Sequence, residues 1–233
     1  MQGVILAAGK GSRMGNIDVP KCLLEINEMP VIRHQINSFK KNGIDDILVV
    51  TGYKSEMIRK LLNNEVKYVE NSKFDEMNNI YSVWLAIQKL QDDFVCVYGD
   101  LMFDEKILVK CLEIENEIGL MVEPNTRDET MKVKIENKRI VAVNKKIENN
   151  EAGGNFIGMA KFSKNITKMV FDEINDLVKN NVDGYYTLGI ENLIKKNIQV
   201  GYQFTNGLSW MDMDEMDEFE EAKKIFGNKE NLR

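Results

Sequence analysis

Short apolar runs and segments of helical periodicity alternate along the first half of the chain. Four runs rich in β-branched residues have the composition of buried strands, at residues 2–7, 45–52, 66–71 and 93–100. Segments with helical spacing of apolar residues separate them, at residues 30–43, 54–64 and 79–90. This alternation predicts a mostly parallel, doubly wound sheet up to about residue 115.

The second half of the chain has a different pattern. Residues 131–147 alternate apolar and basic residues on either side of Asn137 and Lys138, which predicts an antiparallel hairpin. Further strands are expected at residues 155–163 and 199–204, and helices at residues 166–179, 187–196 and 217–226. We therefore predict one mixed α/β domain over residues 1–233, with a Rossmann-like, mostly parallel central sheet flanked by helices and an antiparallel hairpin in its second half.

Charge and cysteine content narrow the function classes. The formal net charge of −6 argues against broad binding of nucleic acid or anionic membranes. No stretch approaches the roughly 20 apolar residues of a membrane span. Cys22, Cys96 and Cys111 are scattered without paired spacing, which argues against a disulfide framework or a structural zinc site. We expect a cytoplasmic protein without nucleic-acid or membrane partners.

The first predicted strand leads into a glycine-rich loop that can hold phosphate. A dinucleotide fingerprint needs G-x-G-x-x-G, but Gly9, Gly11 and Gly15 make this loop one residue too long. The second strand ends at Thr51, not at the acidic residue that would bind a ribose. An NTPase phosphate loop needs Gly-Lys followed by Ser or Thr, whereas Lys10 is followed by glycine. Both interpretations fail on spacing.

The loop nevertheless has the chemistry of a triphosphate site. Its small residues let backbone N–H groups approach a base and a triphosphate closely, at Ala7, Ala8, Gly9 and Gly11. Arg13 offers a planar fork to phosphate oxygens, and Lys21 adds a compact second positive charge. Pro20 stiffens the chain just before that lysine.

Aspartates at two distant places are candidate ligands of Mg²⁺. Asp100 ends the fourth predicted strand, at the sheet edge where α/β proteins bind ligands, and Asp104 is the better cap for the helix that follows. Asp212 and Asp214 alternate with methionines, so as a strand both face one way. Because Mg²⁺ prefers carboxylate oxygens, we predict Asp100 and Asp214 as metal ligands, with Asp212 serving metal or acceptor. Asp217 and Glu218 are expected in the first turn of the closing helix, where the helix dipole favours negative charge.

Longer stretches resemble known nucleotidyltransferases. LAAGKGSRMG followed by PKCLLEI resembles the L-A-A-G-x-G-x-R…P-K-x-L signature of the GT-A-like nucleotidyltransferases. NNIYSVWLA resembles the N-N-x-Y-S segment of bacterial choline-phosphate cytidylyltransferases. Trp210, Asp212 and Asp214 resemble the W-x-E-x-D segment of the phosphocholine and 2-aminoethylphosphonate cytidylyltransferases, with aspartate in place of glutamate. GGNFIGMAKFS is similar to a segment of the phosphonate branch, with Asn155 in place of glutamate.

The resemblance implies a GT-A-type fold with a nucleotide-binding half (residues 1–115) and an acceptor-binding half (residues 116–233). VNKKI resembles the lysine-bearing strand of the phosphonate branch, which places Lys145 near the transferred phosphate, with Arg13 and Lys21 as the other catalytic cations. The nucleotide contacts expected are Leu6, Ala7, Ala8, Gly9, Gly11, Ser12, Arg13, Lys21, Asn78, Tyr98 and Asp100. The acceptor contacts expected are Asn79, Tyr81, Ser82, Asn155, Tyr185, Tyr186 and Asp212.

Some of these residues also have simpler structural interpretations. Asn78 or Asn79 can cap the third helix, and Trp84 is expected in the core. Tyr185 and Tyr186 follow Gly184 in a loop, where an aromatic wall beside Asp183 would suit an ammonium group. Of Lys145 and its neighbour, only one can face inward from a strand.

The predicted reaction is transfer of CMP from CTP to a small phosphate or phosphonate acceptor, with release of pyrophosphate. The acceptors considered are phosphocholine, 2-aminoethylphosphonate and a phosphorylated amino acid or amide such as phosphoglutamine, for cell-surface or capsule decoration. The acceptor oxygen is already anionic, so no general base is needed, and the single histidine, His34, lies inside the first predicted helix. The cofactor is Mg²⁺, and a homodimer is one assembly that the sequence allows.

Two other functions compete with this one. A sugar-1-phosphate nucleotidyltransferase using UTP or dTTP has the same fold and metal chemistry. A nucleotide-sensing homologue without catalysis would keep the fold, but the joint presence of Arg13, Lys21, Asp100 and Asp214 disfavours it.

Overall fold

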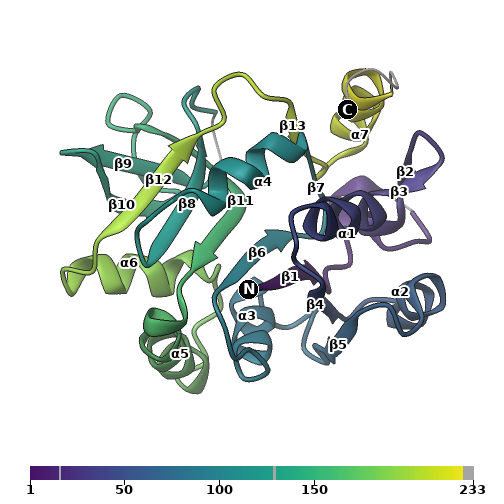
Figure 1. The fold of residues 1–233 in the computed structure, drawn as a ribbon, viewed down its shortest axis with the longest axis horizontal. Helices are drawn as coiled ribbons and strands as arrows, with labels where there is room; N and C mark the ends of the chain where they lie inside the picture. Colours follow the sequence, from purple (N-terminus) through teal and green to yellow (C-terminus); the bar gives the residue numbers. More distant parts are fainter. Residues whose placement is uncertain (16, 128–129, 228–233) are drawn as a thin grey trace.

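A twisted β-sheet runs through the centre of the molecule, with helices on both of its faces (Figure 1). The computed structural model describes residues 1–15, 17–127 and 130–227. The first half contributes the strands β1 (Gln2–Ala7), β4 (Asp46–Thr51), β5 (Lys67–Glu70) and β6 (Phe94–Tyr98). They are parallel neighbours in the order β5-β4-β1-β6, so the predicted doubly wound sheet is confirmed.

The second half extends the same sheet. It adds β8 (Ile118–Glu123), β9 (Lys132–Glu136), β10 (Arg139–Asn144), β11 (Gly154–Phe162) and β12 (Val200–Phe204). β11 runs antiparallel to β6 and joins the two halves, which gives the described residues a nine-stranded sheet in the order β5-β4-β1-β6-β11-β8-β12-β10-β9. The predicted hairpin is β9–β10, and its turn has φ of 49° at Asn137 and 60° at Lys138, as a tight hairpin turn requires.

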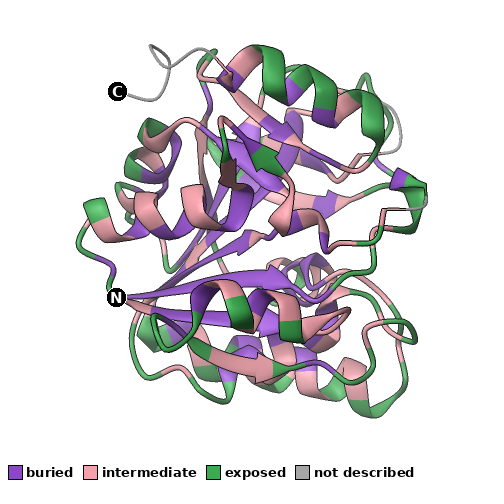
Figure 2. Ribbon diagram, turned by 90° about the vertical axis from the view of Figure 1, so that its right-hand side faces the viewer, coloured by how far each residue is buried: buried purple, intermediate pink, exposed green. Residues whose placement is uncertain are grey.

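Successive side chains of β1 point to opposite faces of the sheet and belong to two separate apolar clusters. The helices that cover the sheet are α1 (Val31–Lys41), α2 (Ser55–Leu62), α3 (Asn79–Ile87), α4 (Glu105–Leu112), α5 (Lys164–Lys179) and α6 (Thr187–Lys195). Val4 and Leu6 belong to the apolar cluster that α3, α5 and α6 cover. Ile5 and Ala7 belong to the opposite cluster, under α1, α2 and α4. Figure 2 shows the buried strands enclosed between these layers.

Two short strand pairs and the closing helix pack beside the sheet. β7 (Leu101–Phe103) pairs antiparallel with β13 (Trp210–Asp212), and β2 (Glu25–Ile26) pairs with β3 (Met29–Pro30). α7 (Met216–Phe226) buries its apolar side against these short strands, in a small apolar cluster that includes Ile26, Met102 and Met211. The pairing of β7 with β13 brings the last part of the chain next to the end of β6 (Figure 1).

Helix starts follow the capping chemistry expected from sequence. The Asp104 carboxylate accepts a hydrogen bond from the N–H of Lys106 at 2.9 Å and caps α4. Asn78 caps α3 in the same way. α7 begins with a capping box between Glu215 and Glu218. The closing helix therefore holds acidic residues in its first turn, as predicted.

The described residues contain no helix long and apolar enough to cross a membrane. The three cysteines are buried free thiols. Burial raises the pKa of the Cys111 thiol to about 12, so this thiol stays protonated and unreactive in the folded protein.

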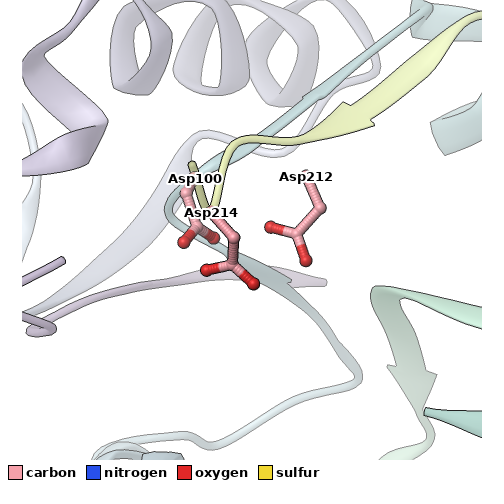
Figure 3. A group of neighbouring side chains, drawn as sticks. All are labelled: Asp100, Asp212 and Asp214. Carbon is pink, nitrogen blue, oxygen red and sulfur yellow. The ribbon is translucent and has the colours of Figure 1, made fainter. Parts of the chain in front are cut away.

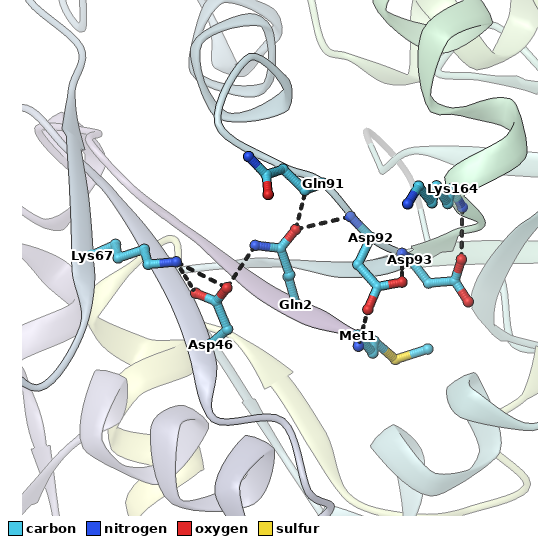
Figure 4. A network of polar contacts seen from close by, with 8 residues as sticks. All are labelled: Met1, Gln2, Asp46, Lys67, Gln91, Asp92, Asp93 and Lys164. Carbon is cyan, nitrogen blue, oxygen red and sulfur yellow. Dashed lines mark hydrogen bonds and ion pairs between the residues drawn. The ribbon is translucent and has the colours of Figure 1, made fainter.

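A polar network ties together the amino-terminal ends of the parallel strands (Figure 4). The Gln2 amide donates to Asp46 at 2.9 Å, and its oxygen accepts from the N–H groups of Gln91 and Asp92 at 2.7 and 3.1 Å. Asp46 also pairs with Lys67 at 2.8 Å, and Asp92 pairs with the chain's amino group at 2.6 Å. These contacts link β1, β4 and β5 at the end of the sheet opposite to the carboxyl ends of the strands.

We expect Gln2→Leu to lower the free energy of unfolding by about 1–3 kcal/mol, because it leaves two backbone N–H groups without their acceptor and removes one of the two donors to Asp46. Urea denaturation measures this difference. Lys89→Ala, an exposed change nearby, should stay within about 0.5 kcal/mol. Equal stability of Gln2→Leu and wild type would show that the network adds nothing to stability.

Candidate active site

A cavity of about 730 Å³ opens at the carboxyl ends of the parallel strands. The glycine-rich loop after β1, the start of α3, the β6–β7 junction and the segment after β13 contribute to its wall. This is the edge at which doubly wound sheets bind ligands. Its size suits a small-molecule ligand.

The glycine-rich loop needs glycine where it passes the lysine. Gly11 has φ of 67°, and a Cβ on it would lie 2.7 Å from Cγ of Lys21. After Gly11 the chain forms a short 3₁₀ turn (Ser12–Met14), in which Met14 is buried and Arg13 is exposed. The loop is therefore anchored by an apolar side chain while its arginine stays free to face the cavity.

Three aspartates from distant parts of the sequence converge in this cavity. Asp100 lies between β6 and β7, and Asp212 lies at the end of β13, where it pairs with Leu101. Asp214 follows two residues later. One carboxylate oxygen from each of the three lies within 4.8 Å of the others. Figure 3 shows the three carboxylates gathered around one small volume.

The cationic residues of the loop reach the same aspartates. The Lys21 ammonium lies 2.6 Å from Oδ1 of Asp214 and 3.3 Å from Oδ2 of Asp100. The Arg13 guanidinium lies 2.6 Å from Oδ2 of Asp214. The glycine-rich loop and the carboxylate cluster are thus parts of one site.

The cluster holds more negative charge than its own cations neutralise. Burial raises the pKa of Asp100 above its ordinary value. Burial, with the charges of Asp100 and Asp214, raises the pKa of Asp212 well above its ordinary value. Burial also opposes ionisation of Asp214, but Lys21 and Arg13 outweigh it and lower the pKa of that carboxyl.

These residues fit a hard divalent cation. Three carboxylates gather on one point, which is the donor set that Mg²⁺ prefers. Oδ1 of Asp212 is buried and has no hydrogen-bond partner within the described ranges, which is costly unless a ligand supplies one. Asp100, Asp212 and Asp214 are therefore the residues that would hold a metal ion.

The cavity gathers nearly all of the residues that the sequence assigned to the site. Those that line it are Leu6, Ala7, Ala8, Gly9, Gly11, Ser12, Arg13, Lys21, Asn78, Asn79, Ser82, Tyr98, Asp100, Lys145, Asn155, Tyr185, Asp212 and Asp214. Lys145 follows the end of β10 and lines the cavity, whereas Lys146 is not among the lining residues.

Two expected acceptor contacts are wrong. Tyr186 is fully buried, and its ring packs edge-on against Tyr98 and Phe156 in the core. Its backbone N–H binds the side chain of Asn79, which fixes this inward direction at the start of α6. Tyr81 stacks on Trp84 with 5.3 Å between ring centroids and does not line the cavity. Core packing accounts for the Tyr186 ring, whereas the half-buried Tyr81 ring lies between Trp84 and the Lys73 ammonium.

Several residues of the cavity wall carry no mark in the amino-acid sequence. Those that no sequence pattern singled out include Asn71, Phe74, Met77, Arg127 and Thr130. Asn71 directly follows β5, so the rule that places ligands at strand ends could have found it. Arg127 lies in an irregular segment after β8 with no motif around it, and no local signal marks it.

The fold and the site together define a class of enzyme. Residues 3–155 match the family model of the MobA-like NTP transferase domain. The chain therefore belongs to this family and is an enzyme of the nucleotidyltransferase class. This confirms the resemblance to nucleotidyltransferases drawn from the glycine-rich loop.

Two of the relatives at the sequence level are cytidylyltransferases. The CTP:phosphoglutamine cytidylyltransferase of Campylobacter jejuni is 27% identical over an alignment of 250 positions, gaps included. The alignment covers 94% of this chain and 98% of that protein. The choline-phosphate cytidylyltransferase of Streptococcus pneumoniae is 35% identical over 106 residues, which cover 44% of this chain and 46% of that protein.

Solved structures of nucleotidyltransferases share the fold. The CTP:phosphocholine cytidylyltransferase from Streptococcus pneumoniae has a TM-score of 0.79 at 23% identity, covering 96% of this chain and 98% of that one. A putative glucose-1-phosphate thymidylyltransferase from Bacillus anthracis has a TM-score of 0.81 at 18% identity, covering 98% and 96%. Enzymes named for different nucleotides therefore share this fold, and the fold alone does not select the base.

Proposed function

We propose that this protein is a Mg²⁺-dependent cytidylyltransferase that transfers CMP from CTP to a small phosphate or phosphonate acceptor and releases pyrophosphate. The observation that carries the proposal is the convergence of Arg13 and Lys21 with three aspartates in one cavity. Cytidine is proposed because the sequence relatives named above are cytidylyltransferases.

The reaction is an in-line displacement at phosphorus. An acceptor oxygen forms a bond to the α-phosphorus of CTP, the bond from that phosphorus to the bridging oxygen breaks, and pyrophosphate leaves with the electron pair. Such transfers depend on positioning and on stabilising negative charge. When bound at Asp100, Asp212 and Asp214, Mg²⁺ neutralises charge on phosphate oxygens.

The chain's own residues supply the remaining positive charge. The planar guanidinium of Arg13 can donate hydrogen bonds to two phosphate oxygens, and the Lys21 ammonium contributes a compact positive charge. Both now pair with carboxylates, so they are already within reach of the place where phosphates and metal would meet. Lys145 lines the same cavity and has no carboxylate partner among residues 1–15, 17–127 and 130–227. We assign it to the transferred phosphate.

No side chain is required as a general base. The acceptor's phosphate or phosphonate oxygen is ionised at neutral pH and attacks without losing a proton. The single histidine supports this assignment, because Nε2 of His34 lies 3.0 Å from the carbonyl oxygen of Ile26 and the ring does not line the cavity. We further propose that the product serves cell-surface decoration and that the enzyme acts in the cytoplasm.

Pyrophosphate release tests the nucleotide. With a panel of phosphorylated acceptors, we expect kcat/KM for CTP to exceed that for UTP, ATP, GTP and dTTP by at least about tenfold. Release that depends on a hexose 1-phosphate and prefers UTP or dTTP would instead assign the protein to the sugar nucleotidyltransferases. No release with any nucleotide, despite nucleotide binding, would favour a sensing role.

A further inference from the structure

Two cations in the cavity differ from those of the glycine-rich loop. Arg13 and Lys21 pair with the aspartate cluster. Lys145 and Arg127 line the same cavity, yet neither has a carboxylate within 4.0 Å in the described parts of the chain. The cavity therefore offers two further positive charges for anions that a ligand would bring. Lys145 is assigned above to the transferred phosphate, which leaves Arg127 without a role.

Arg127 and Lys145 also lie beside two of the aromatic rings that line the cavity. The Arg127 guanidinium lies over the Trp210 ring, 5.5 Å from its centroid. The Lys145 ammonium lies 4.7 Å from the centroid of Tyr185 and 3.2 Å from its hydroxyl. A quaternary ammonium group binds proteins through such aromatic faces. Here each ring already has a cation of the protein beside it, so a second cation would be repelled.

Hydrogen bonds from Thr130 and the buried Asn155 hold the backbone near Arg127. The Thr130 hydroxyl lies 2.8 Å from the carbonyl oxygen of Arg127 and 2.9 Å from Oδ1 of Asn155. The Asn155 amide donates to the carbonyl oxygen of Asn125 at 3.0 Å, and Asn155 itself is only 1% exposed. Asn155 therefore uses both ends of its side chain on Asn125 and Thr130, and it acts as a positioning residue for the backbone near Arg127.

Arg127 contacts a side chain of the strand that carries Asp212. Trp210 and Asp212 are two residues apart on β13, so their side chains project from the same face of that strand. The Trp210 indole is itself fixed, because its N–H donates to Glu123 at 3.1 Å. Arg127 consequently lies beside the strand that carries Asp212.

We propose that the acceptor carries a carboxylate in addition to its phosphate or phosphonate, and that Arg127 binds this carboxylate. The inference rests on the proposed function, because it names the acceptor class of that reaction. A guanidinium binds a carboxylate through two parallel hydrogen bonds, and the flat face of Trp210 keeps its plane oriented. The same arrangement disfavours a trimethylammonium group at the Trp210 and Tyr185 rings.

A matched pair of compounds tests the acceptor class. O-phosphoserine and phosphoethanolamine differ only by one carboxylate, and calorimetry of the full chain with Mg²⁺, with and without a non-hydrolysable CTP analogue, measures binding of each. We expect wild type to bind O-phosphoserine about tenfold or more tighter than phosphoethanolamine. Arg127→Gln should bring this ratio to about one and leave the affinity for the CTP analogue unchanged. Arg139→Gln, an exposed arginine on β10, is the matched control and should keep the wild-type ratio.

The outcomes separate this inference from the proposed function. Equal binding of the two compounds by wild type would overturn the proposal that the acceptor carries a carboxylate. An Arg127→Gln variant that binds both compounds more weakly by the same factor would also overturn it, because Arg127 would then bind the phosphate. Failure of the CTP analogue to bind would overturn the proposed nucleotide instead, while the ratio measured without nucleotide would still report on Arg127.

Discussion

Asp100→Asn should lower kcat by about a thousandfold or more and leave the protein folded. The substitution keeps the shape of the side chain but removes a full negative charge from the cluster with Asp212 and Asp214. A neutral amide is a weaker ligand for a divalent cation than a carboxylate. Because burial and neighbouring charge already raise the pKa of Asp100, losing the charge should not destabilise the metal-free protein. Pyrophosphate release with CTP and a thermal melt measure the two effects.

Asp104→Asn is the matched control for this experiment. Asp104 lies four residues away and caps α4 through the N–H of Lys106, so it affects a helix end and not the cavity. Asparagine is an equally good cap, and we expect no change in rate and a change in stability below about 0.5 kcal/mol. A normal rate for Asp100→Asn, with metal still required, would remove Asp100 from the metal site.

Lys21→Met should destabilise the metal-free protein by about 1–3 kcal/mol and also abolish turnover. The Lys21 ammonium is mostly buried, with 11% of its side chain exposed, and it neutralises both Asp100 and Asp214. Without it, the three carboxylates repel one another with only Arg13 to compensate. Millimolar Mg²⁺ should restore much of the lost stability, since a bound cation replaces the missing charge. Urea denaturation with EDTA or with Mg²⁺ gives both values.

The effect of Lys21→Met should also depend on pH. Lys21 helps to keep the folded-state pKa of Asp214 below its ordinary value, so in wild type this carboxyl adds stability above the ordinary aspartate pKa and loses it as the pH falls through the folded-state value. The difference between wild type and Lys21→Met should therefore be largest near neutral pH and shrink in acid. Lys10→Met, an exposed lysine of the same loop, should match wild type throughout. A variant as stable as wild type in EDTA would show that Lys21 does not compensate the cluster.

Local patterns were sufficient for much of the fold and for the central part of the site. The β-branched runs of β1, β4 and β6 and the helical periodicity between them are local features, and strand ends meet at one edge of a parallel sheet. For that reason the amino-acid sequence was enough to assign Asp100 to the site. Asp212 and Asp214 could be assigned because a motif marks them, although their contact with Asp100 depends on the pairing of β7 with β13.

Other features depend on tertiary contacts that no local pattern encodes. Tyr185 and Tyr186 are adjacent in one loop, yet one lines the cavity and the other lies in the core, because Asn79 binds the backbone of Tyr186. The direction of a loop side chain is decided by such partners and not by its neighbours in sequence. Asn125 and Thr130, which lie on either side of Arg127, are both held by Asn155, about thirty residues further along the chain. The strand β8 was not predicted either, although its residues are apolar and buried.

The structure of the protein crystallised with Mg²⁺ and a non-hydrolysable CTP analogue tests the central claim most directly. We predict one metal ion bound in the cluster of Asp100, Asp212 and Asp214 together with phosphate oxygens, and Arg13 and Lys21 moved from their carboxylates onto the triphosphate. A nucleotide bound elsewhere, or bound in this cavity while Arg13 and Lys21 keep their present pairs with Asp214, would contradict it.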